Sequence, residues 1–261
     1  MGALKLGTIN EFKKDKLLVK IYETRNEMGS AAAAEASTTV KELLAGKEEI
    51  TVIFAAAPSQ NEFLEALAGD SSIDWRRINA LHMDEYVGLP EDAPQRFGNF
   101  LKEAIFSKVP FKSVHYLNGN AEDIDAECER YASLIKDLKP DAVFMGIGEN
   151  GHIAFNDPHV AFFNDKKLVK KVELDEACRI QQVHDGCFTA LSKVPTHALT
   201  LTIPALMDAR YHFCVVPGAT KAQAVFDTVM GDISSSCPAS VLRKYDGCIL
   251  YLDSDSASEI L

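Results

Sequence analysis

One stretch constrains this chain more than any other: residues 143–158, which read V-F-M-G-I-G-E-N-G-H-I-A-F-N-D-P. An apolar run predicts a buried strand, and the glycines at its end allow the backbone to turn sharply and to approach a ligand closely. Asn150, His152 and Asp157 follow, at the place where open α/β sheets bind ligands. Two interpretations are open on these residues alone. His152 serves proton transfer, or it only hydrogen-bonds a glycine-rich turn.

The rest of the chain alternates apolar, β-branched runs with amphipathic segments, which predicts an α/β fold. We expect a modified Rossmann-like, mostly parallel sheet with helices on both faces. A single domain over residues 1–261 is the simplest organisation, and the weakly periodic segment 159–194 is predicted to be an excursion or flap. The predicted strands are 17–23, 50–55, 78–84, 114–117, 141–148, 197–206, 211–218 and 247–253, and the predicted helices are 27–45, 59–69, 96–109, 123–138 and 220–230.

Charge and composition restrict the classes of function that this chain could have. The chain has 261 residues and a net charge of −11, which argues against nucleic acid or an anionic membrane as the principal partner. No apolar run suggests a membrane span, and the N-terminus does not resemble a secretory signal. The six cysteines lack C-x-x-C spacing and several lie in apolar contexts, which favours buried free thiols. We therefore expect a cytoplasmic protein whose partner is a small molecule. The sequence leaves the oligomeric state open, and a homo-oligomer is among the alternatives.

Three further strand ends carry polar side chains. Asp84 and Glu85 are adjacent, so their side chains point to opposite faces and at most one faces a site. Ser59 begins a predicted helix, where it binds a phosphate or forms a capping box with Glu62. Lys221 follows Pro-Gly-Ala-Thr at another helix start. A lysine there is unfavourable for the helix dipole unless an anion is bound, which favours a phosphate ligand.

Several chemistries have no motif in this chain. We find no metal-ligand spacing, no serine nucleophile elbow and no dinucleotide-binding G-x-G-x-x-G followed by an amphipathic helix. The sequence therefore predicts neither a metal nor a nucleotide cofactor.

Taken together, these motifs resemble the glucosamine-6-phosphate deaminase (isomerase) family. The resemblance runs from about residue 17 to the end, and the 6-phosphogluconolactonases share the same fold. The residues that carry it are Met83-Asp-Glu-Tyr-Val-Gly-Leu-Pro90, Leu117-Asn-Gly-Asn-Ala121 with Asp123-Ile-Asp-Ala-Glu-Cys128, residues 148–158, and His197-Ala-Leu-Thr200.

The resemblance implies a reaction without a cofactor. An amino-sugar phosphate ring opens, a proton moves from C2 to C1, and ammonia leaves to give fructose 6-phosphate. By position, Asp84 is similar to the family's base for the C2 proton. His152 matches the ring-opening base, Asp157 the carboxylate that orients it, and Lys221 a phosphate ligand.

Four features depart from the family pattern. Asn150 stands where the best-known members have Asp, and an amide orients a partner without titrating. Asp157 replaces Glu and is one methylene shorter, so the histidine must lie nearer or be bridged by water. The phosphate loop, usually rich in Thr and Gly, reads Ala55-Ala-Ala-Pro-Ser59, whose Cβ atoms limit positive φ. No arginine occurs in residues 181–186, and His184 is the candidate phosphate ligand in its place.

The leading hypothesis is therefore glucosamine-6-phosphate deamination with aldose–ketose isomerisation. The galactosamine epimer is the second. A 6-phosphogluconolactonase-like hydrolase is disfavoured by I-A-F-N-D-P. A non-catalytic sugar-phosphate sensor is prompted by Asn150 and the altered loop. An unphosphorylated substrate would explain the missing glycines.

Overall fold

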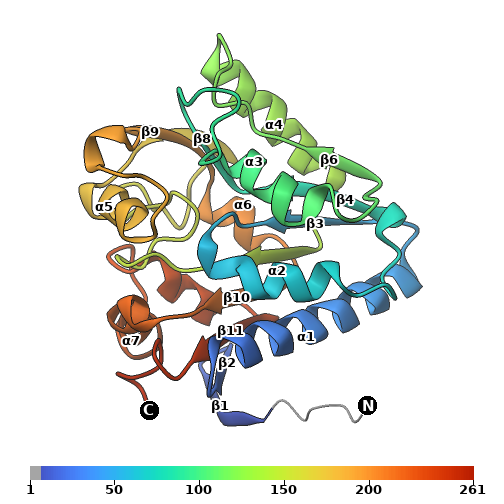
Figure 1. Cartoon of the computed structure of the whole chain (residues 1–261), viewed down its shortest axis with the longest axis vertical. Helices are drawn as coiled ribbons and strands as arrows, with labels where there is room; N and C mark the ends of the chain where they lie inside the picture. The colour runs from blue at the N-terminus through green and yellow to red at the C-terminus, as the bar shows by residue number, and fades with distance from the viewer. Residues whose placement is uncertain (1–6) are drawn as a thin grey trace.

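A computed structural model describes residues 7–261 and contains a central sheet that is parallel except at one edge (Figure 1). Within these residues β1 pairs antiparallel with β2, and every other neighbouring pair is parallel. The predicted mostly parallel α/β fold is thus confirmed. In spatial order the strands are β1 (Thr8–Lys14), β2 (Leu17–Tyr22), β11 (Cys248–Asp253), β10 (Tyr211–Val216), β7 (Ala142–Met145), β3 (Ile50–Phe54), β4 (Ile78–His82) and β6 (Ser113–His115).

Helices cover both faces of this sheet, which explains why its inner strands are mostly apolar and buried on both faces. Successive side chains of a strand point to opposite faces. Along β7, Val143 and Met145 therefore pack in one core cluster and Phe144 in the other. One face carries α1 (Arg25–Gly46), α2 (Asn61–Ala68) and α3 (Phe97–Leu101), and the other carries α4 (Ile124–Leu138), α6 (Ile203–Met207) and α7 (Ala222–Met230).

The helices α1 and α2 lie side by side (Figure 1). Thr24 and Glu27 form a capping box at the start of α1, which satisfies backbone N–H groups there. Gly29 allows the close approach of α2, because a Cβ at this position would lie 2.7 Å from Cβ of Glu62.

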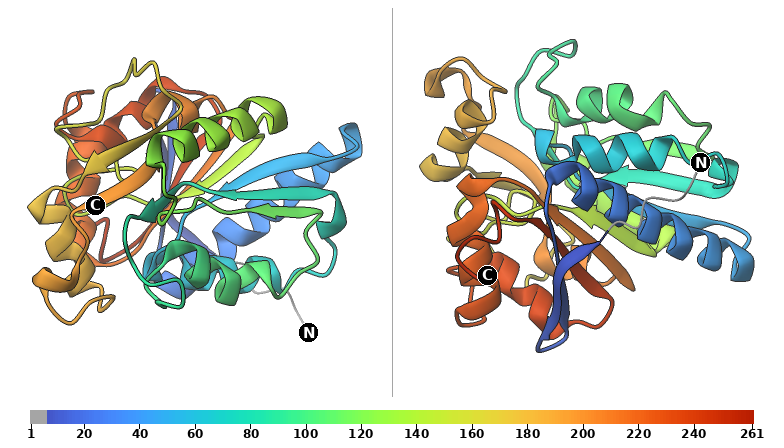
Figure 2. Two further views of the ribbon diagram at one scale, coloured as in Figure 1. Left: turned by 90° about the horizontal axis from the view of Figure 1, so that it is seen from above. Right: turned by 60° about the horizontal axis from the view of Figure 1, so that its bottom comes forward.

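A second, antiparallel sheet lies beside the first and consists of β5 (Asp84–Tyr86), β9 (His197–Leu201) and β8 (Val169–Glu173). The segment 159–194, which the sequence predicts as an excursion, supplies β8 and α5 (Glu176–His184). Both views in Figure 2 show this segment, in yellow to light orange, at one edge of the molecule.

Several predicted boundaries are wrong. The first strand is β1, because Thr8–Lys14 pairs along the sheet edge although its residues are mostly exposed and polar. The strand predicted over 197–206 ends at Leu201, where Thr202 caps α6 by accepting from the backbone N–H of Ala205 at 3.4 Å. The helix predicted over 96–109 is α3 followed by a π-helix at Lys102–Phe106.

Among residues 7–261, no helix combines the length and the apolar character that crossing a membrane requires.

The end of the strand predicted over 78–84 is also wrong, since β4 ends at His82 and Asp84 belongs to the second sheet. The imidazole of His82 fixes the chain between β4 and β5. Its Nδ1 lies 2.9 Å from the Asp84 carbonyl oxygen, and its Nε2 accepts from the Leu117 backbone N–H at 2.9 Å. The buried ring is therefore neutral, and burial lowers the pKa of His82 to about 4.

His82→Gln tests this junction through the pH dependence of stability. In the unfolded chain His82 takes up a proton below about pH 6.5, whereas the folded chain resists it down to about pH 4. The unfolded state therefore binds more protons in this window, and the native protein loses about 3 kcal/mol as pH falls through it.

Urea unfolding at several pH values should show that His82→Gln loses most of this slope. The control is His159→Gln at an exposed histidine, which should keep the wild-type slope. Equal slopes in wild type and His82→Gln would contradict the assignment.

Candidate active site

A pocket lies at the carboxyl ends of four neighbouring parallel strands, β10, β7, β3 and β4. The chain runs outward from β3 to β4 and β6, and then returns to β7 before continuing to β10. The order of the sheet therefore reverses between β3 and β7, and open α/β sheets bind ligands at such a point. The pocket lining brings together four of the predicted site residues: Ser59, Asp84, His152 and Lys221.

The turn after β3 forms one wall of the pocket through Ala55, Ala56 and Ala57. None of these alanines has a positive φ, and Ala57 is extended at −158°. This loop therefore follows a path that alanine adopts without strain, and the family's glycines are not needed here.

Ser59 is not part of a capping box, contrary to one of the two interpretations of the sequence. Gln60 is the N-cap residue of α2 and makes no side-chain cap, while Glu62 pairs with Arg25 of α1 at 2.7 Å. The Ser59 hydroxyl instead accepts from Nε2 of Gln60 at 3.2 Å. Its own proton is free for a ligand in the pocket. Gln60, which sequence reasoning did not single out, also donates to the Val215 carbonyl at 3.1 Å and so ties this wall to β10.

The side chains of Asp84 and Glu85 face opposite ways, as the sequence predicts, and they have different surroundings. Glu85 accepts from the backbone N–H groups of Tyr86, Phe97 and Gly98 at 2.9–3.1 Å, and so holds the start of α3. Asp84 lines the pocket. Burial, followed by the charge of Glu85, raises the pKa of Asp84 well above its usual value. A carboxylate with a raised pKa is a stronger base once it is ionised.

The loop after β7 positions His152. The loop turns back so that the Gly148 N–H donates to the His152 carbonyl oxygen at 2.9 Å, and the imidazole packs directly over Gly148. A Cβ at position 148 would overlap the ring. The loop is anchored from β9, because the Thr200 hydroxyl accepts from the Phe155 N–H at 3.1 Å. Its glycine-rich sequence therefore serves close packing against the histidine.

Asn150 bridges His152 and Asp157. The Asn150 amide nitrogen donates to Oδ1 of Asp157 at 3.0 Å, and Oδ1 of Asn150 accepts from the His152 backbone N–H at 3.1 Å. The same Oδ1 lies 2.7 Å from Nδ1 of His152, and Asp157 Oδ1 lies 3.3 Å from that nitrogen. The shorter Asp157 carboxylate thus approaches the ring directly, and the Asn150 amide spans the rest of the gap.

These contacts assign the tautomer of His152. Two acceptor oxygens face Nδ1, so Nδ1 carries the proton and Nε2 keeps a free lone pair. Burial opposes the charge on Asp157. The hydrogen bonds and charge of His152, the Asn150 amide and the Asp175 N–H outweigh burial and lower the pKa of Asp157. Asp157 is therefore a fixed carboxylate that orients the ring.

Lys221 places a cation in the same pocket. Gly218, at a φ of 94°, makes the turn from β10, and its N–H donates to both carboxylate oxygens of Asp253 at 3.0 and 3.1 Å. The Lys221 side chain is buried and, within residues 7–261, forms no ion pair. Burial lowers the pKa of Lys221, against the opposing charges of Asp185 and Glu149. A buried ammonium without a carboxylate partner is suited to an anionic ligand.

Helix α5 closes the pocket with Gln181 and Gln182, which sequence reasoning did not select. Gln181 accepts from the Glu149 N–H at 2.7 Å and so connects α5 to the histidine loop. His184 does not line this pocket. Its side chain is largely exposed at the end of α5, and its Nδ1 lies 3.4 Å from Glu149.

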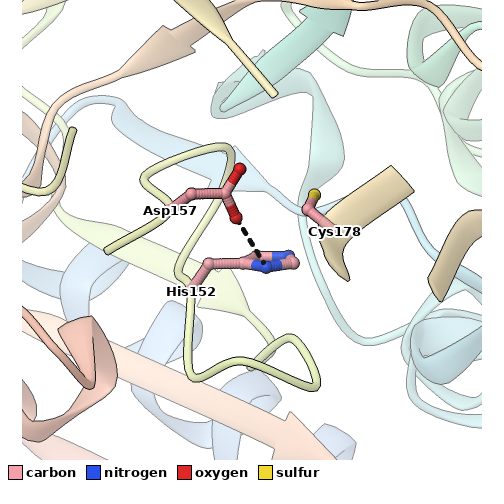
Figure 3. Close-up of side chains that lie close together, drawn as sticks. All are labelled: His152, Asp157 and Cys178. Carbon is pink, nitrogen blue, oxygen red and sulfur yellow. Dashed lines mark ion pairs between the residues drawn. The ribbon is translucent and has the colours of Figure 1, made fainter. Parts of the chain in front are cut away.

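Cys178 is a further side chain that spacing in the sequence does not reveal. It approaches His152 and Asp157 from α5, whereas those two residues lie on one loop (Figure 3). Asp157 Oδ2 accepts from the Asp175 N–H at 2.9 Å, which fixes the start of α5 against the loop. The Cys178 sulfur, a ring nitrogen of His152 and a carboxylate oxygen of Asp157 lie within 4.8 Å of one another. Burial and the charge of Asp157 raise the pKa of Cys178 well above its usual value.

Comparison with known proteins relates this chain to one family. Residues 23–251 match the model of the family described as glucosamine-6-phosphate isomerases/6-phosphogluconolactonase. The chain is 35% identical over 210 residues to a glucosamine-6-phosphate deaminase of Listeria innocua, covering 80% of this chain and 88% of the relative. It is 35% identical over 240 residues to that of an Exiguobacterium species, covering 92% and 91%.

Solved structures show the same fold. A monomeric glucosamine-6-phosphate deaminase superposes with a TM-score of 0.83 at 28% identity, covering 92% of this chain and 99% of that one. A 6-phosphogluconolactonase from Thermotoga maritima has a TM-score of 0.74 at 23% identity, covering 91% and 99%, and is similar in fold.

Gly148→Ala tests how the imidazole is held. The added Cβ would overlap the ring, so we expect the His152 side chain to leave its position and lose its contact with Asn150. Overpacking of this kind should lower the free energy of unfolding by roughly 1–3 kcal/mol. A crystal structure and the imidazole NMR signals would report the ring, and urea unfolding would report stability.

The matched control is Gly69→Ala, where the nearest atoms to an added Cβ lie at 3.5 Å and φ is −73°. This variant should leave the His152 signals unchanged. An unmoved ring in Gly148→Ala would show that the histidine is not packed as described.

Proposed function

The chain belongs to the family of glucosamine-6-phosphate isomerases and 6-phosphogluconolactonases, and on that basis we propose that it deaminates and isomerises an amino-sugar phosphate. The proposed reaction converts glucosamine 6-phosphate and water into fructose 6-phosphate and ammonia, without a cofactor. One observation carries the proposal: Asp84, His152 and Lys221 line one pocket although they follow three different strands.

The first proposed step opens the sugar ring. Nε2 of His152 accepts the proton of the anomeric hydroxyl and returns it to the ring oxygen as the C1–O bond breaks. A histidine suits this shuttle because it accepts and donates a proton near neutral pH. The Asn150 amide and Asp157 support the step by keeping the other nitrogen, Nδ1, protonated. Both are proposed to position the base without titrating.

The second proposed step moves a proton between carbons. Asp84 takes the proton from C2 and delivers a proton to C1, while a proton of the C2 ammonium passes to O1. This leaves an iminium at C2 and a hydroxyl at C1. Water then adds to C2 and ammonia departs. The raised pKa of Asp84 supports this role, because a base must be strong enough to remove a proton from carbon and still release it. The ammonium at C2 of the substrate would favour the ionised carboxylate on binding.

The third element of the proposal is the phosphate site. Lys221 supplies the charge, and Ser59 with backbone N–H groups at the start of the following helix supplies hydrogen bonds. Support comes from the buried lysine, which forms no ion pair within residues 7–261, and from the Ser59 hydroxyl, which donates no hydrogen bond to any of these residues. We propose glucosamine 6-phosphate ahead of its galactosamine epimer, since the relatives from Listeria innocua and Exiguobacterium are named glucosamine-6-phosphate deaminases. A cytoplasmic setting is supported by six free cysteines, five of them buried.

Asp84→Asn should abolish ammonia release while sugar-phosphate binding persists. The amide keeps the size of the carboxylate but cannot accept the C2 proton. We expect a loss of kcat of about a thousandfold or more, measured by coupled ammonia assay, with Kd for the substrate changed little. Asp92→Asn, at an exposed carboxylate, is the control and should keep wild-type kcat. Retained turnover in Asp84→Asn would refute the assignment of the base.

Lys221→Met should weaken binding through the phosphate alone. Loss of one charged contact in a buried site predicts a rise in KM for glucosamine 6-phosphate of about tenfold to a hundredfold. The weak turnover of unphosphorylated glucosamine should be changed little, because that sugar never made the contact. Lys166→Met at an exposed lysine is the control. An equal effect on both sugars would show that Lys221 does not bind the phosphate.

A further inference from the structure

The buried cluster of Cys178, His152 and Asp157 brings three different donor atoms close together (Figure 3). A sulfur, a nitrogen and an oxygen lie within 4.8 Å of one another, and the three residues are at most 8% exposed. Residues 152 and 157 come from the loop after β7, and residue 178 comes from α5. Folding therefore builds a ligand set for which the sequence has no metal-binding motif.

We propose that this cluster is an inhibitory Zn²⁺ site. Zn²⁺ binds thiolate, imidazole and carboxylate ligands in tetrahedral geometry, and three protein ligands leave a fourth position for water. A thiolate ligand discriminates against Mg²⁺ and Ca²⁺, which prefer oxygen. His152 lines the pocket, so the proposed metal would lie beside the space that the substrate would occupy.

Binding of the metal moves one proton within the His152 ring and releases another from Cys178. Zn²⁺ takes the Nδ1 lone pair of His152, so the ring proton moves from Nδ1 to Nε2. It takes the thiolate of Cys178, whose proton leaves to solvent, and an oxygen of Asp157 that is already ionised. One proton is released in total.

This exchange explains why the metal inhibits. Nε2 is the nitrogen that accepts the anomeric proton in the proposed reaction, and a ring metallated at Nδ1 carries its proton there. The metal would also take Nδ1 away from the Asn150 oxygen, which lies 2.7 Å from it. The catalytic histidine is thereby locked in the wrong tautomer.

The charges around the cluster favour a cation. The carboxylates of Asp157, Asp84 and Asp175 all act on Cys178. Lys221 opposes them from across the pocket, where its charge and that of Cys178 also interact. Asp157, whose pKa is lowered, keeps a negative charge within the cluster itself.

The binding test uses Co²⁺ as a spectroscopic probe of the full-length protein, followed by displacement with Zn²⁺. We expect one equivalent of Co²⁺ to give a thiolate-to-metal absorption band. Cys178→Ser should lose the band and weaken Zn²⁺ binding by about a hundredfold, because serine is a poor zinc ligand. Cys187→Ser, at the partly exposed cysteine near the end of α5, is the matched control and should keep both.

The inhibition test rests on the proposed function and follows ammonia release from glucosamine 6-phosphate. One equivalent of Zn²⁺ should slow wild type and Cys187→Ser by about tenfold or more, with recovery on chelation, while Mg²⁺ has no effect. Cys178→Ser should resist Zn²⁺. If that variant does not fold, Cys178→Ala replaces it.

The two tests separate the two proposals. Absence of ammonia release together with a Cys178-dependent Co²⁺ band would remove the proposed function and keep the metal site. A Co²⁺ spectrum without a sulfur band, or equal inhibition of wild type and the Cys178 variants, would overturn the metal site.

Discussion

The parallel pairing of four central strands is the constraint on which the site depends. It brings the carboxyl ends of β10, β7, β3 and β4 to one edge, and the reversal of strand order between β7 and β3 opens space there. Backbone hydrogen bonds hold these ends together beyond the strands themselves, from Ala55 to Phe144 at 2.8 Å and from Met83 to Phe54 at 3.3 Å. A one-residue shift of any strand would turn its site residue away from the pocket.

Within this frame, some polar side chains of the site are fixed by protein partners, and others line the pocket. Glu85 is satisfied by three N–H groups, whereas Asp84 lines the pocket. Asn150 satisfies Asp157 and His152 at once, which leaves only the pocket-facing nitrogen of the ring free. Preorganisation of this kind avoids the cost of reorienting dipoles during a reaction.

Reasoning from sequence located the strand-end residues and missed those that depend on tertiary packing. Asp84 and His152 were predictable because polar groups after buried strands meet at one sheet edge. The capping box at Ser59 failed because Arg25 of α1, distant in sequence, takes Glu62. Cys178 could not be placed beside the histidine, because its position depends on how α5 folds over the loop.

The measurement that tests the central claim most directly is a comparison of substrates on one preparation of the protein. Glucosamine 6-phosphate, galactosamine 6-phosphate, unphosphorylated glucosamine and 6-phosphogluconolactone would be supplied in turn, with ammonia, fructose 6-phosphate and acid release followed. The account predicts equimolar ammonia and fructose 6-phosphate from glucosamine 6-phosphate, with kcat/KM at least about a hundredfold above that for the unphosphorylated sugar. Rapid acid release from the lactone without ammonia from either hexosamine phosphate would contradict it.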